Sequence, residues 1–175
     1  MFYDTDTGET GVLLDRLLFA NGLALSPRED FLLVSETTVA RITRYWLKGA
    51  KKGTRDTFAE NLPGFPDNIR NAVGGGYWVG FGAKRAQPFS LLDTIAPYPM
   101  VKNLLAKIVP KRLIVSFVKS YGLIVKMDEE GELVESLHDP TGAVIAHISE
   151  VVETKDVLYL GSYKNRFLGV LRKHQ

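Results

Sequence analysis

The stretch that decides the fold is Leu62–Phe81, which reads LPGFPDNIRNAVGGGYWVGF. Two prolines and a glycine predict a rigid turn, and the carboxylate–carboxamide pair Asp67-Asn68 follows it at the start of an apolar strand. Three glycines predict a second turn, and the aromatic run Tyr77–Phe81 predicts a second strand. We therefore expect a strand–turn–strand unit that carries two oxygen-bearing side chains at its mouth.

The same unit occurs three times along the chain. Asn21 precedes an apolar strand, a turn and the run LLVSE, and His147-Ile148-Ser149 precedes EVVE, a turn and the run LYLG. The units start about 47 and about 80 residues apart, and removing an insert of roughly 33 residues restores the spacing to about 47. Repeats of this length with four short strands are typical of β-propeller blades. The sequence thus predicts an all-β chain of about three blades.

The remaining strands follow from short apolar or alternating runs between turn residues. They are expected at Val12–Leu14, Gly22–Leu25, Phe31–Val34, Ala40–Leu47, Thr54–Ala59, Gly122–Met127, Glu132–Leu137, Ala143–Val152, Val157–Gly161 and Phe167–Leu171.

The insert, at about 88–120, carries Leu, Ile, Val and Lys at helical spacing and is broken by Pro97, Pro99 and Pro110. We expect two or three short helices there. One interpretation is a helix packed on the edge of a sheet. The alternative is a basic amphipathic surface that touches a membrane or closes over a pocket.

Composition excludes several classes of protein. The chain has 175 residues and a net charge of +2, enough for one globular unit over 1–175 and unlike a nucleic-acid-binding domain. It has no cysteine, which excludes disulfides, zinc–thiolate sites and cysteine nucleophiles. No apolar run approaches the roughly 18 residues of a membrane-spanning helix. Three blades leave sheet edges bare, so we expect the chain to need further blades or a partner.

Five motifs resemble the strictosidine synthase-like family: FANGLALSP (Phe19–Pro27), LPGFPDNIR (Leu62–Arg70), GGYWVG (Gly75–Gly80), SLHDPTG (Ser136–Gly142) and ISEV with LYLGS (Ile148–Ser162). The resemblance implies a six-bladed β-propeller, of which 1–175 would be the C-terminal half with a helical insert. It also implies kinship with the calcium-dependent paraoxonase and lactonase propellers.

The resemblance extends to location and assembly. A membrane-anchored member of the family implies a parent protein held by one N-terminal helix that lies outside this chain, with the propeller on the lumenal or extracellular side. The N-terminal blades would be needed to close the ring.

A calcium site is the first functional expectation. Asn21, Asp67 and Asn68 match positions at which the related propellers hold calcium in their central channel. Calcium prefers six to eight hard oxygen donors, which Asn, Asp and water supply. From the residues alone, ordinary polar turn and cap positions are the better explanation of the same three side chains.

The resemblance implies a calcium-dependent hydrolase of arylesterase or lactonase type, acting on a small ester or lactone. His147 opens an inner strand and is the candidate catalytic base, whereas His138 is expected in a turn. The catalytic glutamate of strictosidine synthase falls on Ser149, which argues against that activity, and Glu150 is expected on the opposite face. The alternative is a non-catalytic, membrane-associated binding or adhesion propeller.

Several other polar and aromatic residues are expected to have structural roles. Arg70 is a candidate partner for the Asp67 carboxylate. Glu36-Thr37-Thr38 is expected to form a loop, and the alternative is that it lines the channel. Trp46, Tyr77 and Trp78 are expected in the blade core.

Overall fold

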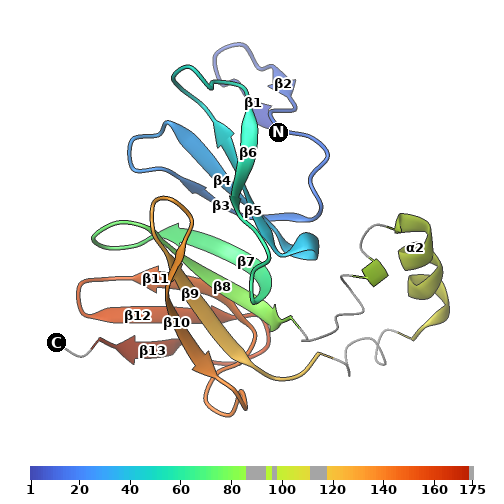
Figure 1. The fold of residues 1–175 in the computed structure, drawn as a ribbon, viewed down its shortest axis with the longest axis vertical. Helices are drawn as coiled ribbons and strands as arrows, with labels where there is room; N and C mark the ends of the chain where they lie inside the picture. The colour runs from blue at the N-terminus through green and yellow to red at the C-terminus, as the bar shows by residue number, and fades with distance from the viewer. Residues whose placement is uncertain (86–93, 96–97, 111–117, 174–175) are drawn as a thin grey trace.

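Three antiparallel sheets form the body of the molecule (Figure 1). The computed structural model describes residues 1–85, 94–95, 98–110 and 118–173. The first sheet has the order β3-β4-β5-β6, the second β7-β8-β9-β10 and the third β11-β12-β13. The expectation of an all-β chain of about three propeller blades is confirmed.

Each blade is built from strands that are consecutive in the chain, and only β8 and β9 are separated by a long segment. Their bounds are β3 Ala20–Leu25, β4 Phe31–Glu36, β5 Arg41–Trp46 and β6 Arg55–Ala59 in blade one; β7 Gly64–Asn71, β8 Tyr77–Lys84, β9 Gly122–Met127 and β10 Leu133–Asp139 in blade two; and β11 Ile148–Glu153, β12 Val157–Ser162 and β13 Gly169–Arg172 in blade three. A separate hairpin, β1 Phe2–Tyr3 and β2 Thr10–Gly11, precedes them, and the 3-10 turn η1 spans Thr37–Val39.

Apolar side chains between neighbouring blades form the core. Leu33 and Ile42 of blade one pack with Ile69, Val79 and Phe81 of blade two. A second cluster joins blades two and three through Trp78, Ile124, Ile148, Val151 and Leu158. Tyr77 and Trp78 are therefore core residues as expected, while Trp46 is half-buried and packs edge-on against Phe31.

Three expected elements differ from the structure. Val12–Leu14 is not a strand, since β2 ends at Gly11. The strand expected from Ala143 begins only at Ile148, because the Asp139 carboxylate accepts the N–H groups of Val144 and Ile145 and holds them in a loop. His138 lies in β10 rather than in a turn, because the strand continues through Asp139 and the turn starts at Pro140.

The insert joins the second and third strands of blade two. It contains one described helix, α2 Pro99–Ile108, with proline in its first turn where no N–H partner is needed. The other expected helices lie largely outside the described residues. Because β8 and β9 still pair directly, the insert does not interrupt the blade.

Candidate functional site

The first strand of each blade carries the same irregularity. In β3, β7 and β11, two residues lie opposite one residue of the next strand, which is a β-bulge. The bulged pairs are Asn21-Gly22 opposite Ser35, Asp67-Asn68 opposite Gly80, and Ser149-Glu150 opposite Gly161. All of the candidate metal ligands thus occupy bulges.

This corrects the expected position of Asp67 and Asn68. They do not open a strand behind a turn; they lie in the middle of β7, and Pro66 precedes them within the same strand. Pro66 has no N–H to donate to a ladder, and proline inside a sheet is found at edges and bulges. The bulge suspends the in–out alternation, and both Asp67 and Asn68 are half-buried.

Glycines bring the bulges of neighbouring blades into contact. A Cβ on Gly22 would lie 2.5 Å from both the Asn68 Cα and the Asp67 carbonyl oxygen. A Cβ on Gly80 would lie 3.0 Å from the Ile148 carbonyl oxygen. Only residues without a side chain permit this approach, so β3 packs closely against β7, and β8 against β11, at the level of the bulges.

Asn21 and Asp67 meet across the first two blades. Asn21 lies close enough to the Asp67 carboxylate to lower its pKa as a side-chain hydrogen-bond donor, and its Nδ2 donates to Thr37 Oγ1 at 3.3 Å. Thr37 Oγ1 in turn donates to the Pro66 carbonyl at 2.7 Å. Because these bonds use the amide N–H groups of Asn21, its Oδ1 oxygen keeps its lone pairs for another ligand.

The Asp67 carboxylate is electrostatically unfavourable in this setting. Burial raises the pKa of Asp67, the Glu150 charge raises it further, and the hydrogen bond from Asn21 lowers it. The expected partner Arg70 does not compensate the charge. Its Nη2 instead lies 2.7 Å from Glu150 Oε2, and its Nη1 lies 3.4 Å from the Leu23 carbonyl oxygen.

Arg70 therefore ties β7 to both β3 and β11, and no cation among the described residues is a cause of the pKa shift of Asp67. Glu150, expected on the opposite face, is close enough for its charge to act on Asp67. The alternation argument fails there because Glu150 is the second residue of a bulge.

His147 and Tyr163 converge on the carbonyl of Gly82. His147 is 2% exposed, and its Nδ1 lies 2.9 Å from Gly82 O. The Tyr163 hydroxyl lies 3.0 Å from the same oxygen and 3.1 Å from His147 Nδ1. A carbonyl oxygen only accepts, so the contact with Gly82 O favours the tautomer that carries its proton on Nδ1, and in that neutral tautomer Nε2 holds a lone pair. That buried Nε2 has no hydrogen-bond partner among the described residues.

Tyr163 brings this group next to Asp67. A Cβ on Gly82 would lie 3.2 Å from the Tyr163 ring and 3.5 Å from Asp67 Oδ2. Partial burial of the phenol and the negative charge of Asp67 both raise the pKa of Tyr163. Sequence reasoning missed Tyr163, which follows β12 directly and belongs to no motif. The one available signal was the position of Tyr163 directly after Ser162. Ser162 pairs with Ile148, the residue that follows His147, so the pairing brings Tyr163 close to His147.

Glu36 is a structural residue rather than part of a channel loop. It ends β4 and is fully buried, and its carboxylate binds Arg41 Nη2 at 2.7 Å, Thr43 Oγ1 at 2.6 Å and the Leu18 N–H at 2.8 Å. Burial alone would raise the pKa of Glu36, but these hydrogen bonds hold it below its usual value.

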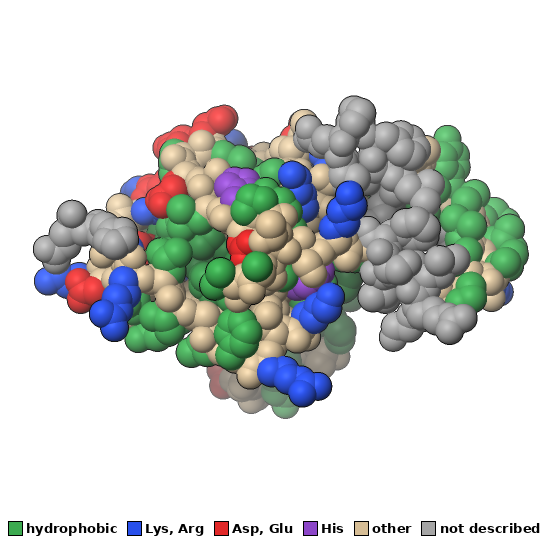
Figure 2. Space-filling model, turned by 90° about the horizontal axis from the view of Figure 1, so that it is seen from below, with side chains coloured by type: hydrophobic (Ala, Val, Ile, Leu, Met, Phe, Trp, Pro, Cys, Tyr) green, Lys and Arg blue, Asp and Glu red, His purple; other side chains and the backbone are tan. Residues whose placement is uncertain are grey.

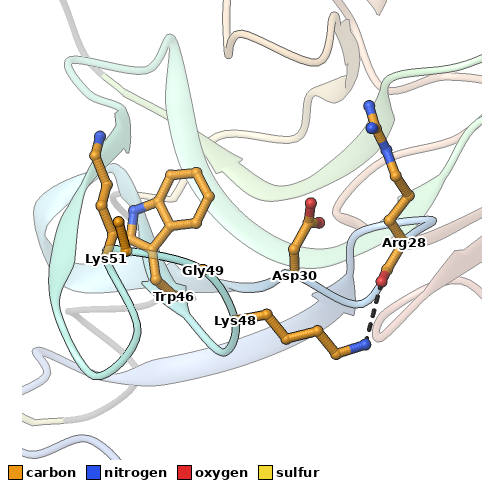
Figure 3. Close-up of a pocket in the computed structure, with 7 residues that line it drawn as sticks. Arg28, Asp30, Trp46, Lys48, Gly49 and Lys51 are labelled. Atoms are coloured by element: carbon orange, nitrogen blue, oxygen red, sulfur yellow. Dashed lines mark hydrogen bonds between the residues drawn. The ribbon is translucent and has the colours of Figure 1, made fainter.

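The most evident surface hollow lies elsewhere. A pocket of about 420 Å³ on blade one is lined by Trp46, Lys51, Arg28 and neighbours, and in Figure 3 Lys48 spans it to the Arg28 carbonyl. It contains no candidate site residue. Within the described part of the chain, no three His, Cys, Asp or Glu side chains are grouped as a metal site, so a cation at Asp67 would depend on amide oxygens.

Comparisons with known proteins agree with the blade pattern. The family model described as "Strictosidine synthase" matches residues 1–50. The human adipocyte plasma membrane-associated protein is 49% identical over 167 residues, 95% of this chain and 40% of that protein. The Arabidopsis thaliana protein strictosidine synthase-like 10 is 41% identical over 170 residues, 96% of this chain and 45% of that protein.

Solved structures show the same fold. A gluconolactonase from Xanthomonas campestris has a TM-score of 0.51 at 21% identity, covering 85% of this chain and 36% of its own. A luciferin-regenerating enzyme has a TM-score of 0.51 at 16% identity, covering 83% and 38%.

The chain spans about 40% of the length of the animal relatives that it matches. Those relatives are named for association with the plasma membrane, and no helix among the described residues is long and apolar enough to cross a bilayer. By sequence, the chain belongs to the strictosidine synthase-like family.

Proposed function

We propose that this chain contributes to a calcium-dependent hydrolase propeller of arylesterase or lactonase type. The observation that carries the proposal is Asp67, a half-buried carboxylate with a raised pKa whose neighbouring arginine is paired with Glu150. Such a group is stabilised by a bound cation.

The donor set fits calcium. Asn21 offers an amide oxygen from blade one, and Asp67 and Asn68 offer a carboxylate and an amide from blade two. These are hard oxygen donors, and three of them fall short of the six to eight that calcium takes. The others would come from water and from the N-terminal blades of a complete ring. When bound, the ion would polarise a substrate carbonyl and stabilise the developing oxyanion.

His147 is our candidate base, and its tautomer is set by the chain itself. The bond from Nδ1 to Gly82 O directs the lone pair of Nε2 away from that carbonyl, and Nε2 is the atom able to take a proton. The exposed Tyr163 contacts both the Gly82 carbonyl and His147 Nδ1 through its hydroxyl, and its ring lies close to Gly82 on the side of Asp67.

Strictosidine synthase chemistry is not proposed. Ser149 occupies the position matched to the catalytic glutamate of that enzyme, and a hydroxyl cannot serve as a carboxylate base at neutral pH. The neighbouring Glu150 is engaged by Arg70.

The test is aryl-acetate hydrolysis by the full-length protein, before and after chelation and after calcium is restored. We expect chelation to abolish turnover and calcium to recover it. Asp67→Ala should lack this activity, whereas Asp156→Ala, at an exposed position of blade three, should retain it. Turnover that is absent or indifferent to chelation would leave the non-catalytic, membrane-associated binding propeller as the better description.

The plasma-membrane names of the relatives support a parent protein at a membrane. We propose that its propeller lies on the lumenal or extracellular side. Calcium is abundant enough there to fill modest sites, as in extracellular calcium-binding modules.

A further inference from the structure

Helix α2 presents a stripe of exposed apolar side chains. Met100, Leu104 and Ile108 are spaced by four residues and so lie on one face of the helix, with exposed fractions of 85%, 57% and 68%. Val101 beside them is also exposed, at 42%. A stripe of this kind on a helix normally faces a core or an interface.

The stripe is not covered by the blades. Figure 1 shows α2 standing apart from the three sheets, and Figure 2 shows apolar side chains gathered at the edge of the molecule where α2 lies. Within the described residues, the exposure of all four side chains means that no strand packs against this face.

The surrounding sequence is strongly cationic. From Thr94 to Tyr121 there is no Asp or Glu, and the basic residues are Lys102, Lys107, Lys111, Arg112 and Lys119. Lys107 and Lys119 are exposed. Apolar side chains bordered by cations match the interface of an anionic bilayer, in which acyl chains lie beneath negative headgroups. An apolar groove on a protein would explain the stripe but not the absence of every acidic residue.

We propose that α2 is an interfacial helix that binds an anionic lipid surface through Met100, Leu104 and Ile108. The segment that carries it leaves β8 at Lys84 and returns at Tyr121, whose carbonyl accepts the His147 N–H at 3.0 Å. Gly82 lies two residues before the exit point. Lipid binding by α2 therefore holds the Gly82–His147 end of the blades against the membrane. This inference does not depend on calcium or on hydrolysis.

Vesicle flotation of the full chain tests the proposal. We expect binding to phosphatidylcholine vesicles containing about 30% phosphatidylserine, weak binding to pure phosphatidylcholine, and weaker binding as salt is raised. The double variant Met100→Glu/Leu104→Glu should bind the anionic vesicles at least about tenfold less. Val144→Glu is the matched control, since Val144 is 76% exposed in a loop of blade three and should bind like the wild type.

A fluorescent reporter gives a second readout. Leu104→Trp should show a blue-shifted emission and quenching by brominated lipid on anionic vesicles, whereas Val144→Trp should show neither. Circular dichroism should confirm that the variants fold. Absence of wild-type binding, equal binding by the double variant, or equal signals from the two reporters would overturn the proposal.

Discussion

Replacing Asp67 by Asn separates the charge of the candidate site from its shape. The pKa of Asp67 is raised in the folded chain, so folding favours the protonated, neutral form. The ionised group therefore lowers stability above its unfolded pKa, and this penalty is relieved as pH falls through the folded pKa. Asparagine imitates the neutral form. Without metal at pH 7, Asp67→Asn should be at least as stable as the wild type.

Added calcium should make the wild type more stable than Asp67→Asn. Extracellular calcium modules have dissociation constants on the order of 10⁻⁴–10⁻³ M, and a site with three protein donors belongs at the weak end. At about 10 mM calcium, mass action then stabilises the wild type by about 1.4–2.7 kcal/mol. For a chain of this size, that corresponds to a rise in Tm of about 3–10 °C. Asp67→Asn should rise by less than about 1 °C, because the only carboxylate of the donor set is gone.

Thermal unfolding in EDTA, calcium chloride, magnesium chloride and sodium chloride of equal ionic strength measures these shifts. Asp156→Asn, which removes the same charge from an exposed position, is the control and should keep the calcium shift. Two results would refute the reasoning. One is a full calcium shift in Asp67→Asn, and the other is an equal loss of the shift in Asp156→Asn.

Three further predictions follow from individual contacts. Gly22→Ala should lower the free energy of unfolding in urea by about 1–3 kcal/mol, because its Cβ would meet the backbone of the Asp67-Asn68 bulge. Glu36→Gln should cost about 1.5–3 kcal/mol in the same assay, since a buried carboxylate with three donors loses its charge. Backbone N–H groups of Ile145 and Val144 lower the pKa of Asp139 to about 2. The ionised Asp139 therefore stabilises the folded chain fully above its unfolded pKa of 3.8, and this contribution is lost as pH falls toward the folded pKa of about 2. Asp139→Asn should flatten acid unfolding across that window.

Most strands of the three blades followed from local sequence. Alternating apolar residues and glycine turns recur at a near-constant spacing, and four short strands per repeat leave few folds other than a propeller. The errors occurred where a tertiary contact decides. Ala143–Val152 looked strand-like throughout, but the Asp139 carboxylate, from the preceding strand, holds the N–H groups of Val144 and Ile145 in a loop. A pattern of apolar residues does not encode such a cap.

Part of the candidate site was predictable from the sequence repeat. Asn21 and Asp67 lie at equivalent points of the repeat, and the structure brings their side chains together. The partner of Arg70 was predicted wrongly, because the guanidinium reaches Glu150 on a strand that lies 80 residues further along the chain. Tyr163 was missed because its relation to Asp67 exists only through the close packing of Gly82.

The repeated bulge explains how a blade pattern becomes a site. In a regular strand, adjacent residues face opposite ways, so only one of Asp67 and Asn68 could turn toward the neighbouring blades. A β-bulge, in which two residues lie opposite one, interrupts this alternation of side-chain direction. The bulge occurs at the same point of the first strand in all three blades. Each blade then fills its first bulge position differently, with Asn21, Asp67 and Ser149. Because Arg70 neutralises Glu150 in the third bulge, the described blades present one uncompensated carboxylate among neutral oxygen donors. That distribution of charge favours a divalent cation over an anionic ligand, and it makes Asp67 the residue on which binding should depend most.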